Sequence, residues 1–367
     1  MAVHPTDLGE IRLAEHSWFF AGGQHVETDE GGFLEGSMYV ENYVPAARTQ
    51  DVPVVMVHGK GQTGIGFTGT PDGRRGWLHD FLRAGYQVYV VDQPERGRSG
   101  HGMSTLRQPD GLTRSPAERV ERIFTPGRAV SDRPRSRHHD QWPGTGVRGD
   151  ADFDQFYSSQ VESLSDGRRT QELNRAALVA LLDRIGRAVL LTHSQSGSFG
   201  WAVADARPDL VAAILAVEPH GPPFHTVMFE PAGGAWYRYA EGRSLPWGIS
   251  ALPLTYEPPA STADDLQPVL DEESGDEESV MAYRLGRPRR LPNLAGIPIL
   301  IVSGQASYHA CYDYATSLFL TDAGVENDYV ALQDVGITGN GHMMMQEKNN
   351  HQIADWLLGW LDGRASG

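Results

Sequence analysis

The chain has 367 residues, enough for one large α/β domain with insertions or for two smaller domains. Its formal net charge of -16 at pH 7 argues against a nucleic acid or an anionic membrane surface as a partner. The single cysteine, Cys311, excludes an internal disulfide and a cysteine-based metal site, and no apolar stretch approaches the roughly 20 residues of a membrane span.

The chain is expected to begin with an antiparallel hairpin at one sheet edge, formed by residues 17–20 and 37–44 around a turn at Gly31-Gly32. From residue 52 onward, apolar strands alternate with amphipathic helices, which indicates a mostly parallel sheet covered on both faces. The expected strands are residues 52–57, 88–91, 188–191, 211–217, 297–302 and 328–332, and the expected helices are residues 76–84, 173–185, 199–206, 312–323 and 350–362.

Two segments interrupt this alternation. Residues 101–170 are rich in Arg, Pro, Gly and His, and residues 221–293 carry several aromatic side chains. Both follow the carboxyl ends of sheet strands, where open α/β sheets place their ligand clefts, so we interpret them as cap insertions. The predicted organisation is a single domain in five parts, with boundaries at 1–100, 101–170, 171–220, 221–293 and 294–367.

The strongest chemical signal is the segment 190–197, where an apolar strand stops at small polar residues and a helix follows. This layout is typical of a nucleophile elbow, whose usual pattern is Gly-x-Ser-x-Gly. Centred on Ser194, the flanking residues are Thr192 and Ser196, which are small but are not glycine. We prefer Ser194 to Ser196 as the nucleophile because His193 and Gly197 match the common Gly-His-Ser-x-Gly-Gly form. The alternative is a Ser/Gly-rich turn without chemistry.

A nucleophilic serine needs a base, and the chain order in this kind of fold is Ser, acid, His. His342 fits the base because it lies in a Gly-rich loop between the last strand and the last helix, whereas the rival His351 lies within that helix. Glu218 ends a buried strand, where a carboxylate needs a partner such as an imidazolium. Asp313, after the next strand, is the alternative acid.

Backbone amides are expected to form an oxyanion hole. One amide is that of Gln195, the residue after the serine. The second comes from the Gly-rich loop 58–64, which follows the first central strand, and we leave it open between Lys60 and Gly61.

Together these residues resemble the α/β-hydrolase superfamily, and within it the bacterial esterase 713 group. The resemblance spans roughly residues 15–365 and rests on the segments 192–197, 217–219, 340–346, 349–350, 70–74, 76–77 and 92–93. It implies a serine carboxylesterase-type hydrolase with a glutamate as the third member of the triad. Lys60-Gly61 departs from the family type, and a cation there would alter substrate preference.

The expected reaction is hydrolysis of a small-molecule ester or lactone by Ser194, His342 and Glu218, with no metal or organic cofactor. Acyl transfer by the same triad and a catalytically silent binding protein are the alternatives. We expect neither a nucleic acid nor a membrane as a partner, and the sequence is compatible with a homodimer. No signal peptide is visible, so we expect a cytoplasmic protein as given, or a secreted or periplasmic one if a leader has been removed.

Overall fold

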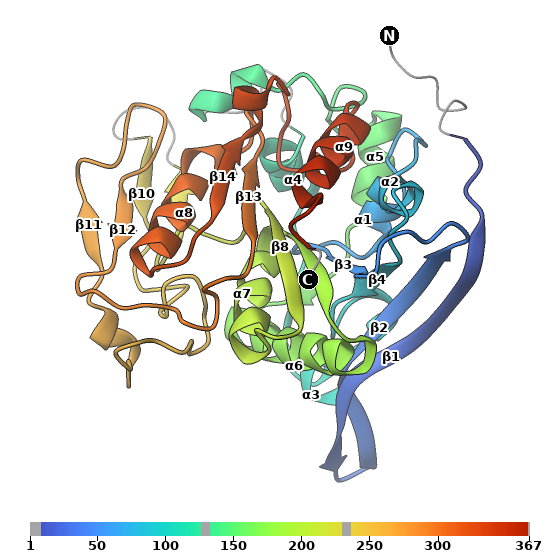
Figure 1. The fold of residues 1–367 in the computed structure, drawn as a ribbon, viewed down its shortest axis with the longest axis horizontal. Helices are drawn as coiled ribbons and strands as arrows, with labels where there is room; N and C mark the ends of the chain where they lie inside the picture. The colour runs from blue at the N-terminus through green and yellow to red at the C-terminus, as the bar shows by residue number, and fades with distance from the viewer. Residues whose placement is uncertain (1–8, 126–132, 230–235, 366–367) are drawn as a thin grey trace.

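A computed structural model describes residues 9–125, 133–229 and 236–365. Its centre is an eight-stranded sheet in the order β1-β2-β4-β3-β7-β8-β13-β14 (Figure 1). Strands β1, β2 and β4 pair antiparallel, and all the other neighbours pair parallel. The strands are β1 (Leu13–Thr28), β2 (Gly31–Pro45), β3 (Val54–Val57), β4 (Val88–Asp92), β7 (Ala188–His193), β8 (Val211–Val217), β13 (Ile299–Ser303) and β14 (Asp328–Ala331).

The predicted hairpin at the sheet edge is confirmed, but its turn lies elsewhere. Asp29 and Glu30 form the turn, and Gly31 already belongs to β2, where it pairs with Thr28. The Thr28 hydroxyl closes the turn by donating to the carbonyl oxygen of Gly31 at 3.0 Å and accepting from the Glu30 amide at 3.2 Å. The prediction followed the glycines and overlooked this side-chain bond, which is a common device in turns.

The predicted parallel core is confirmed. Every residue of β3, β7, β8 and β13 is buried. Strands covered on both faces need apolar side chains on both faces, which explains their continuous rather than alternating apolar sequence.

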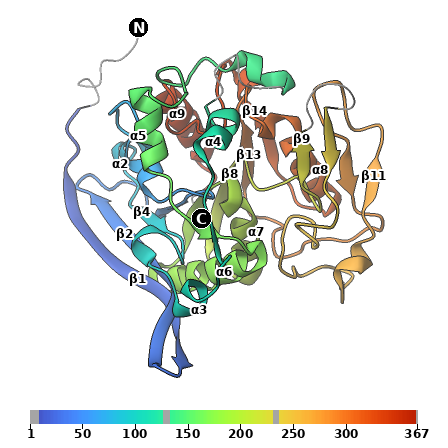
Figure 2. The same cartoon turned by 180° about the vertical axis from the view of Figure 1, so that it is seen from behind.

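Helices cover the two faces of the sheet (Figures 1 and 2). One apolar core includes residues of α6 (Gly167–Ile185), α7 (Gly197–Ala206) and α8 (Asp313–Asp322), and the other includes residues of α2 (Trp77–Arg83) and α9 (Asn350–Leu361). Helix α6 starts six residues before the predicted start, because the Asp166 carboxylate caps it by accepting from the Arg169 amide at 3.0 Å.

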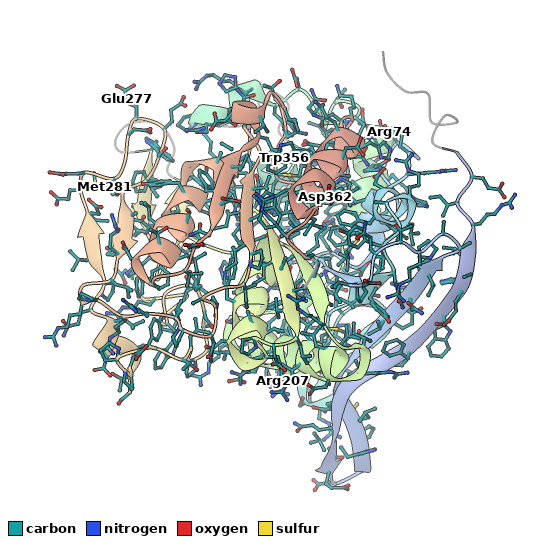
Figure 3. The ribbon with its side chains drawn as sticks, viewed as in Figure 1. Arg74, Arg207, Glu277, Met281, Trp356 and Asp362 are labelled. Atoms are coloured by element: carbon teal, nitrogen blue, oxygen red, sulfur yellow. The ribbon has the colours of Figure 1, made fainter. Side chains whose placement is uncertain are left out.

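The segments that interrupt the alternation contain short elements only. Between β4 and α6 lie α3 (Met103–Leu106), β5 (Leu112–Thr113), α4 (Ala117–Ile123), α5 (Ala151–Ser158) and β6 (Ser163–Leu164). Between β8 and β13 lie β9 (Val227–Phe229), β10 (Tyr237–Tyr239), β11 (Val269–Asp271) and β12 (Ala282–Arg284), with Glu277 and Met281 at the outer end of the molecule (Figure 3). Arg137 and Glu278 join the two segments through an ion pair of 2.5 Å. No helix in the described ranges is long and apolar enough to cross a membrane.

Candidate active site

The predicted strand, turn and helix around Ser194 are confirmed. Strand β7 ends at His193, a 3-10 turn (η4) covers Ser194–Ser196, and α7 begins at Gly197. Ser194 has a φ of 56°, the left-handed conformation that a non-glycine residue rarely adopts. The turn therefore holds the serine in a strained conformation at the carboxyl end of the sheet, as a nucleophile elbow does.

The residues around Ser194 explain how the elbow forms without both usual glycines. The Ser196 hydroxyl donates to the carbonyl oxygen of Val57 in β3 at 2.7 Å and accepts from the His193 amide at 2.8 Å. It thereby links the turn to the neighbouring strand. Glycine is required one residue later, because a Cβ at Gly197 would lie 2.4 Å from the Cβ of Pro219.

The structure brings Glu218 and His342 together. Nδ1 of His342 lies 2.5 Å from Oε2 of Glu218, and both side chains are almost fully buried. The Glu218 carboxylate also accepts from the Gly304 amide at 2.7 Å and from the Ser307 hydroxyl at 2.6 Å. With three donors on the carboxylate, we assign the proton of the imidazole to Nδ1, which leaves Nε2 as an acceptor.

The rival residues have other partners. Asp313 lies 3.0 Å from Nδ1 of His309 and accepts from the Ser303 hydroxyl at 2.6 Å. His351 pairs with Asp80 at 2.9 Å. Neither rival makes a hydrogen bond with His342 in the part of the chain that the structure describes.

Burial has the largest effect on the pKa values of His342 and Glu218. It lowers the pKa of His342 well below the usual value, and His309, His193 and Arg133 lower it further. Burial raises the pKa of the Glu218 carboxyl, and the charge of Asp313 adds to that rise. A lowered imidazole pKa keeps His342 neutral near pH 7, the form in which Nε2 is able to accept a proton.

Tyr308 contacts both the serine and the histidine, and no pattern in the sequence indicates it. Its hydroxyl lies 3.4 Å from Nε2 of His342. Burial raises the pKa of Tyr308, and a hydrogen bond with Ser194 partly offsets that rise. Within the described residues, no hydrogen bond joins Ser194 directly to His342; such bonds are often long in enzymes without substrate.

The two candidate amides in the loop after β3 differ in their contacts. The Gly61 amide donates to the Ser163 hydroxyl at 2.9 Å, so it is already engaged. The carbonyl oxygen of Gly59 lies 3.0 Å from Nη1 of Arg96 and 2.9 Å from Nδ1 of His58. The carbonyl and N–H of a trans peptide point in opposite directions, so these two contacts turn the Lys60 N–H the other way.

Arg96, in the turn that follows β4, is a second residue that no sequence pattern indicates. Its side chain is buried, and Nη2 lies 3.4 Å from Oε1 of Gln195. Burial lowers the pKa of Arg96 only to about 10, so the guanidinium stays charged near pH 7. It therefore joins the loop that carries Lys60 to the residue that follows Ser194.

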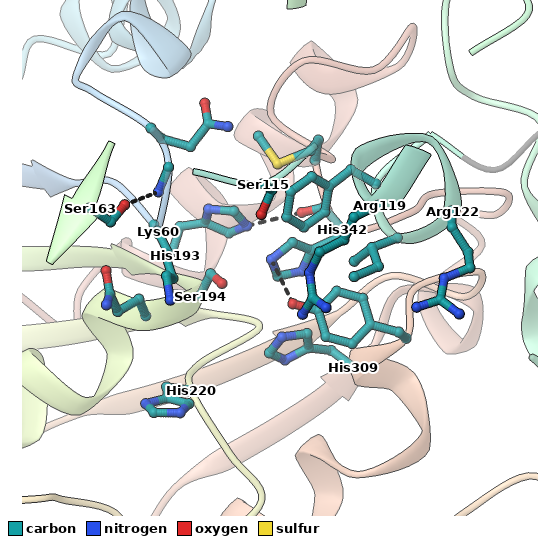
Figure 4. Close-up of a pocket in the computed structure, with 18 of the residues that line it drawn as sticks. Lys60, Ser115, Arg119, Arg122, Ser163, His193, Ser194, His220, His309 and His342 are labelled. Carbon is teal, nitrogen blue, oxygen red and sulfur yellow. Dashed lines mark hydrogen bonds between the residues drawn. The ribbon is translucent and has the colours of Figure 1, made fainter. Parts of the chain in front are cut away.

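Ser194 and His342 line a cavity of about 620 Å³ at the carboxyl edge of the parallel strands (Figure 4). Ser194, Gln195, Lys60, His193 and His342 all contribute to its wall. Nε2 of His193 bonds the carbonyl oxygen of His342 at 3.0 Å, so this histidine holds the loop that carries His342. A volume of this size is typical of small-molecule sites.

Glu218, His309 and His342 place ligand atoms within 4.8 Å of one another, close enough to hold a metal ion. However, Nδ1 of His342 already bonds Glu218, and Nδ1 of His309 already bonds Asp313. We therefore interpret the cluster as a hydrogen-bonded network and assign no metal to it.

The chain is similar to known proteins in both sequence and fold. No protein-family model matches the chain. A solved structure described as a novel bacterial esterase superposes with a TM-score of 0.66, at 24% identity and 98% coverage of each chain. The sheet and this likeness show the α/β-hydrolase fold, as the sequence predicts.

A fungal protein named probable secreted lipase phiG, from Fungal sp., is 42% identical to this chain over 350 residues. The match covers 94% of this chain and 89% of the relative. The chain belongs to the family of that lipase, and it is a carboxylic ester hydrolase.

Proposed function

We propose that this chain hydrolyses a small-molecule carboxylic ester or lactone through an acyl-enzyme, with Ser194, His342 and Glu218 as the catalytic triad. The observation that carries the proposal is the 2.5 Å contact between Glu218 and His342 beside a strained Ser194 in one cavity. A nucleophile, a base and a group that orients the base are what acyl transfer requires.

In the first half of the reaction, the Ser194 oxygen attacks the carbonyl carbon while Nε2 of His342 takes the hydroxyl proton. His342 then gives that proton to the leaving alcohol, and the acyl-enzyme remains. In the second half, His342 removes a proton from water, the hydroxide attacks the acyl carbon, and Ser194 leaves with the proton. Glu218 holds the ring and stabilises its charged form in both halves.

We assign the oxyanion hole to the amides of Gln195 and Lys60. Gly61, the other candidate, is engaged by Ser163, and the contacts of Arg96 and His58 with Gly59 favour Lys60. Each such donor is typically worth about 2.7–4 kcal/mol of the barrier.

The names of the similar proteins, a secreted lipase and an esterase, favour a carboxylic ester bond as the target and a secreted location over a cytoplasmic one. We carry over the bond type and the location only, because the residues that line the cavity determine which acyl and alcohol groups fit.

Covalent labelling tests the nucleophile. A fluorophosphonate is expected to label the wild-type protein at Ser194, and hydrolysis across a panel of esters and lactones should disappear in Ser194→Ala. Ser158→Ala serves as the matched control, because it removes an exposed serine hydroxyl in α5 that does not line the cavity. Undiminished turnover by folded Ser194→Ala protein would overturn the proposal. Product analysis with a competing alcohol separates hydrolysis from acyl transfer.

A further inference from the structure

The wall of the cavity is positively charged, although the whole chain carries a net charge of -16. Within the described ranges, no aspartate or glutamate lines the cavity. The basic residues in its wall are Lys60, Arg114, Arg119, Arg122 and Arg133.

The charged side chains of helix α4 have different surroundings: its arginines line the cavity, and its glutamates do not. Arg119 and Arg122 are three residues apart, a spacing that places them on one helix face, and both line the cavity. The helix's two glutamates, Glu118 and Glu121, bond instead with Arg148 at 2.6 and 3.0 Å, and none of these three residues lines the cavity. The acidic residues nearest in sequence are therefore engaged elsewhere.

Three of these cations lack an acidic partner. Among the residues that the structure describes, Lys60, Arg119 and Arg122 make no ion pair and no side-chain hydrogen bond, whereas Arg114 at the rim pairs with Glu162 at 3.5 Å. Figure 4 shows Lys60 on the Ser194 side of the cavity and Arg119 and Arg122 on the side of α4.

The like charges act on one another. Burial lowers the pKa of the Lys60 ammonium, and the charges of Arg96 and Arg119 lower it further. Cations that share a cavity repel each other, and solvent screens part of this repulsion because Lys60, Arg119 and Arg122 are exposed. An anionic ligand would replace this repulsion with charge-assisted hydrogen bonds.

We propose that the ester substrate carries a separate anionic oxygen group, a carboxylate or a phosphate, that is bound by Lys60, Arg119 and Arg122 while the ester carbonyl lies at Ser194. The proposal rests on the hydrolytic function proposed above and specifies its substrate class. Apolar side chains that also line the cavity, Phe124, Val227 and Phe229, suit the hydrocarbon part of such a molecule.

Matched substrate pairs test the proposal. The first arm compares monoethyl esters of linear dicarboxylic acids of increasing length with their primary-amide isosteres, which differ in charge but hardly in shape. The second arm compares acyl esters of glycerol phosphate with acyl esters of glycerol. We expect kcat/KM to be at least about tenfold higher for the anionic member of one arm, the effect of a charge-assisted hydrogen bond. The arm with the larger ratio identifies the anion.

Variants that each remove one charge test whether these three side chains cause the preference for the anionic ester. The ratio of kcat/KM between the anionic and the neutral ester should fall in Arg119→Gln, in Arg122→Gln and in Lys60→Met, which keeps the backbone amide. Arg207→Gln is the matched control, because Arg207 pairs with Asp183 at the opposite end of the molecule (Figure 3) and its loss should leave the ratio unchanged. Added salt should raise KM for the anionic ester alone.

A binding readout separates this proposal from the hydrolytic one. Free dicarboxylates or glycerol phosphate should slow the labelling of Ser194 by a fluorophosphonate, and the matching diamides or glycerol should not. Equal kcat/KM for charged and neutral members in both arms, with active wild-type enzyme, would overturn the substrate class and leave the hydrolase intact. Absence of any Ser194-dependent hydrolysis would overturn both.

Discussion

Two buried carboxylates, Glu218 and Asp313, each bond one of two stacked imidazoles near Ser194. The rings of His309 and His342 have centroids 4.5 Å apart and an interplanar angle of 14°. Glu218 bonds one ring and Asp313 bonds the other. The sequence left the choice of acid open between these carboxylates, because both follow buried strands and only the packing shows which imidazole each one contacts.

The two carboxylates should differ in their effect on catalysis. We expect Glu218→Gln to lower kcat by about 10⁴-fold, the size of effect seen when the residue that orients a catalytic histidine loses its charge. Asp313→Asn should lower kcat much less, because it changes the partner of His309. Steady-state kinetics on both proteins, with circular dichroism to verify folding, makes the comparison. An equal or larger loss in folded Asp313→Asn would reverse the assignment.

Arg96 is expected to act by positioning the Lys60 amide. Its bond to the Gly59 carbonyl fixes the peptide that carries the proposed oxyanion donor. Arg96→Gln should lower kcat by about 10²-fold with little change in KM, since loss of one such donor costs about that much. Binding of a boronic acid that mimics the tetrahedral intermediate should weaken in parallel.

Arg98→Gln is the control for Arg96, because Arg98 lies in the same turn but pairs with Asp92 and Glu41. It should affect stability without the selective loss of kcat. If both variants lost kcat and KM together, a purely structural role for the turn would be the better account.

At the scale of elements, the nucleophile turn was predictable despite its missing glycines. The apolar run before it and the helix after it identify the layout, while Ser194 and Gly197 fix its register. The sequence alone does not show that the Ser196 hydroxyl joins β7 to β3 through two hydrogen bonds. That bond depends on strand order, and strand order is a property of the folded sheet.

Removing the Ser196 hydroxyl should destabilise the turn that carries Ser194. We expect Ser196→Ala to lower the free energy of unfolding by about 1–3 kcal/mol, because the buried Val57 carbonyl loses its donor and the His193 amide its acceptor. Urea denaturation measures the change. Ser158→Ala, which removes an exposed hydroxyl bonded within α5, should change the free energy by less than about 0.5 kcal/mol. Equal effects in the two variants would contradict the role given to Ser196.

At the scale of the whole molecule, apolar periodicity was sufficient to predict the sheet, its two covered faces and the confirmed hydrolase class. The site was predictable only where a residue sits at the end of a regular element, as Ser194 and Glu218 do. Tyr308 lines the cavity from an irregular segment and Arg119 from the short helix α4, while Arg96 contacts Gln195 from a turn. No spacing along the chain predicts these positions.

Buried neutral histidines should make the fold sensitive to acid. Burial lowers the pKa of His58 and of His193 to about 3, and the Gln93 amide donates to Nε2 of His58, which holds that ring in its neutral form. The unfolded chain therefore binds protons first, below its pKa of about 6.5. Stability present above that pH is lost as the pH falls toward the lowered values, by about 1 kcal/mol per pH unit for each ring.

Urea denaturation between pH 8 and about pH 5 measures this loss, and the reference is the plateau expected above about pH 7. The midpoint should fall steadily below pH 6.5. A midpoint that stays constant or rises on acidification would show that these rings do not dominate the acid response, because Glu218, whose carboxyl pKa is raised by burial, acts in the opposite direction.

The positive cavity also bears on what happens after bond cleavage. Every ester hydrolysis creates a new acid, which ionises near neutral pH, so each turnover leaves one more negative charge among the arginines than the substrate brought. The departing acid is then held more firmly than the molecule that entered. Under the proposed substrate class, we therefore expect product release rather than attack on the carbonyl to limit turnover, and we expect the accumulated acid to inhibit its own formation.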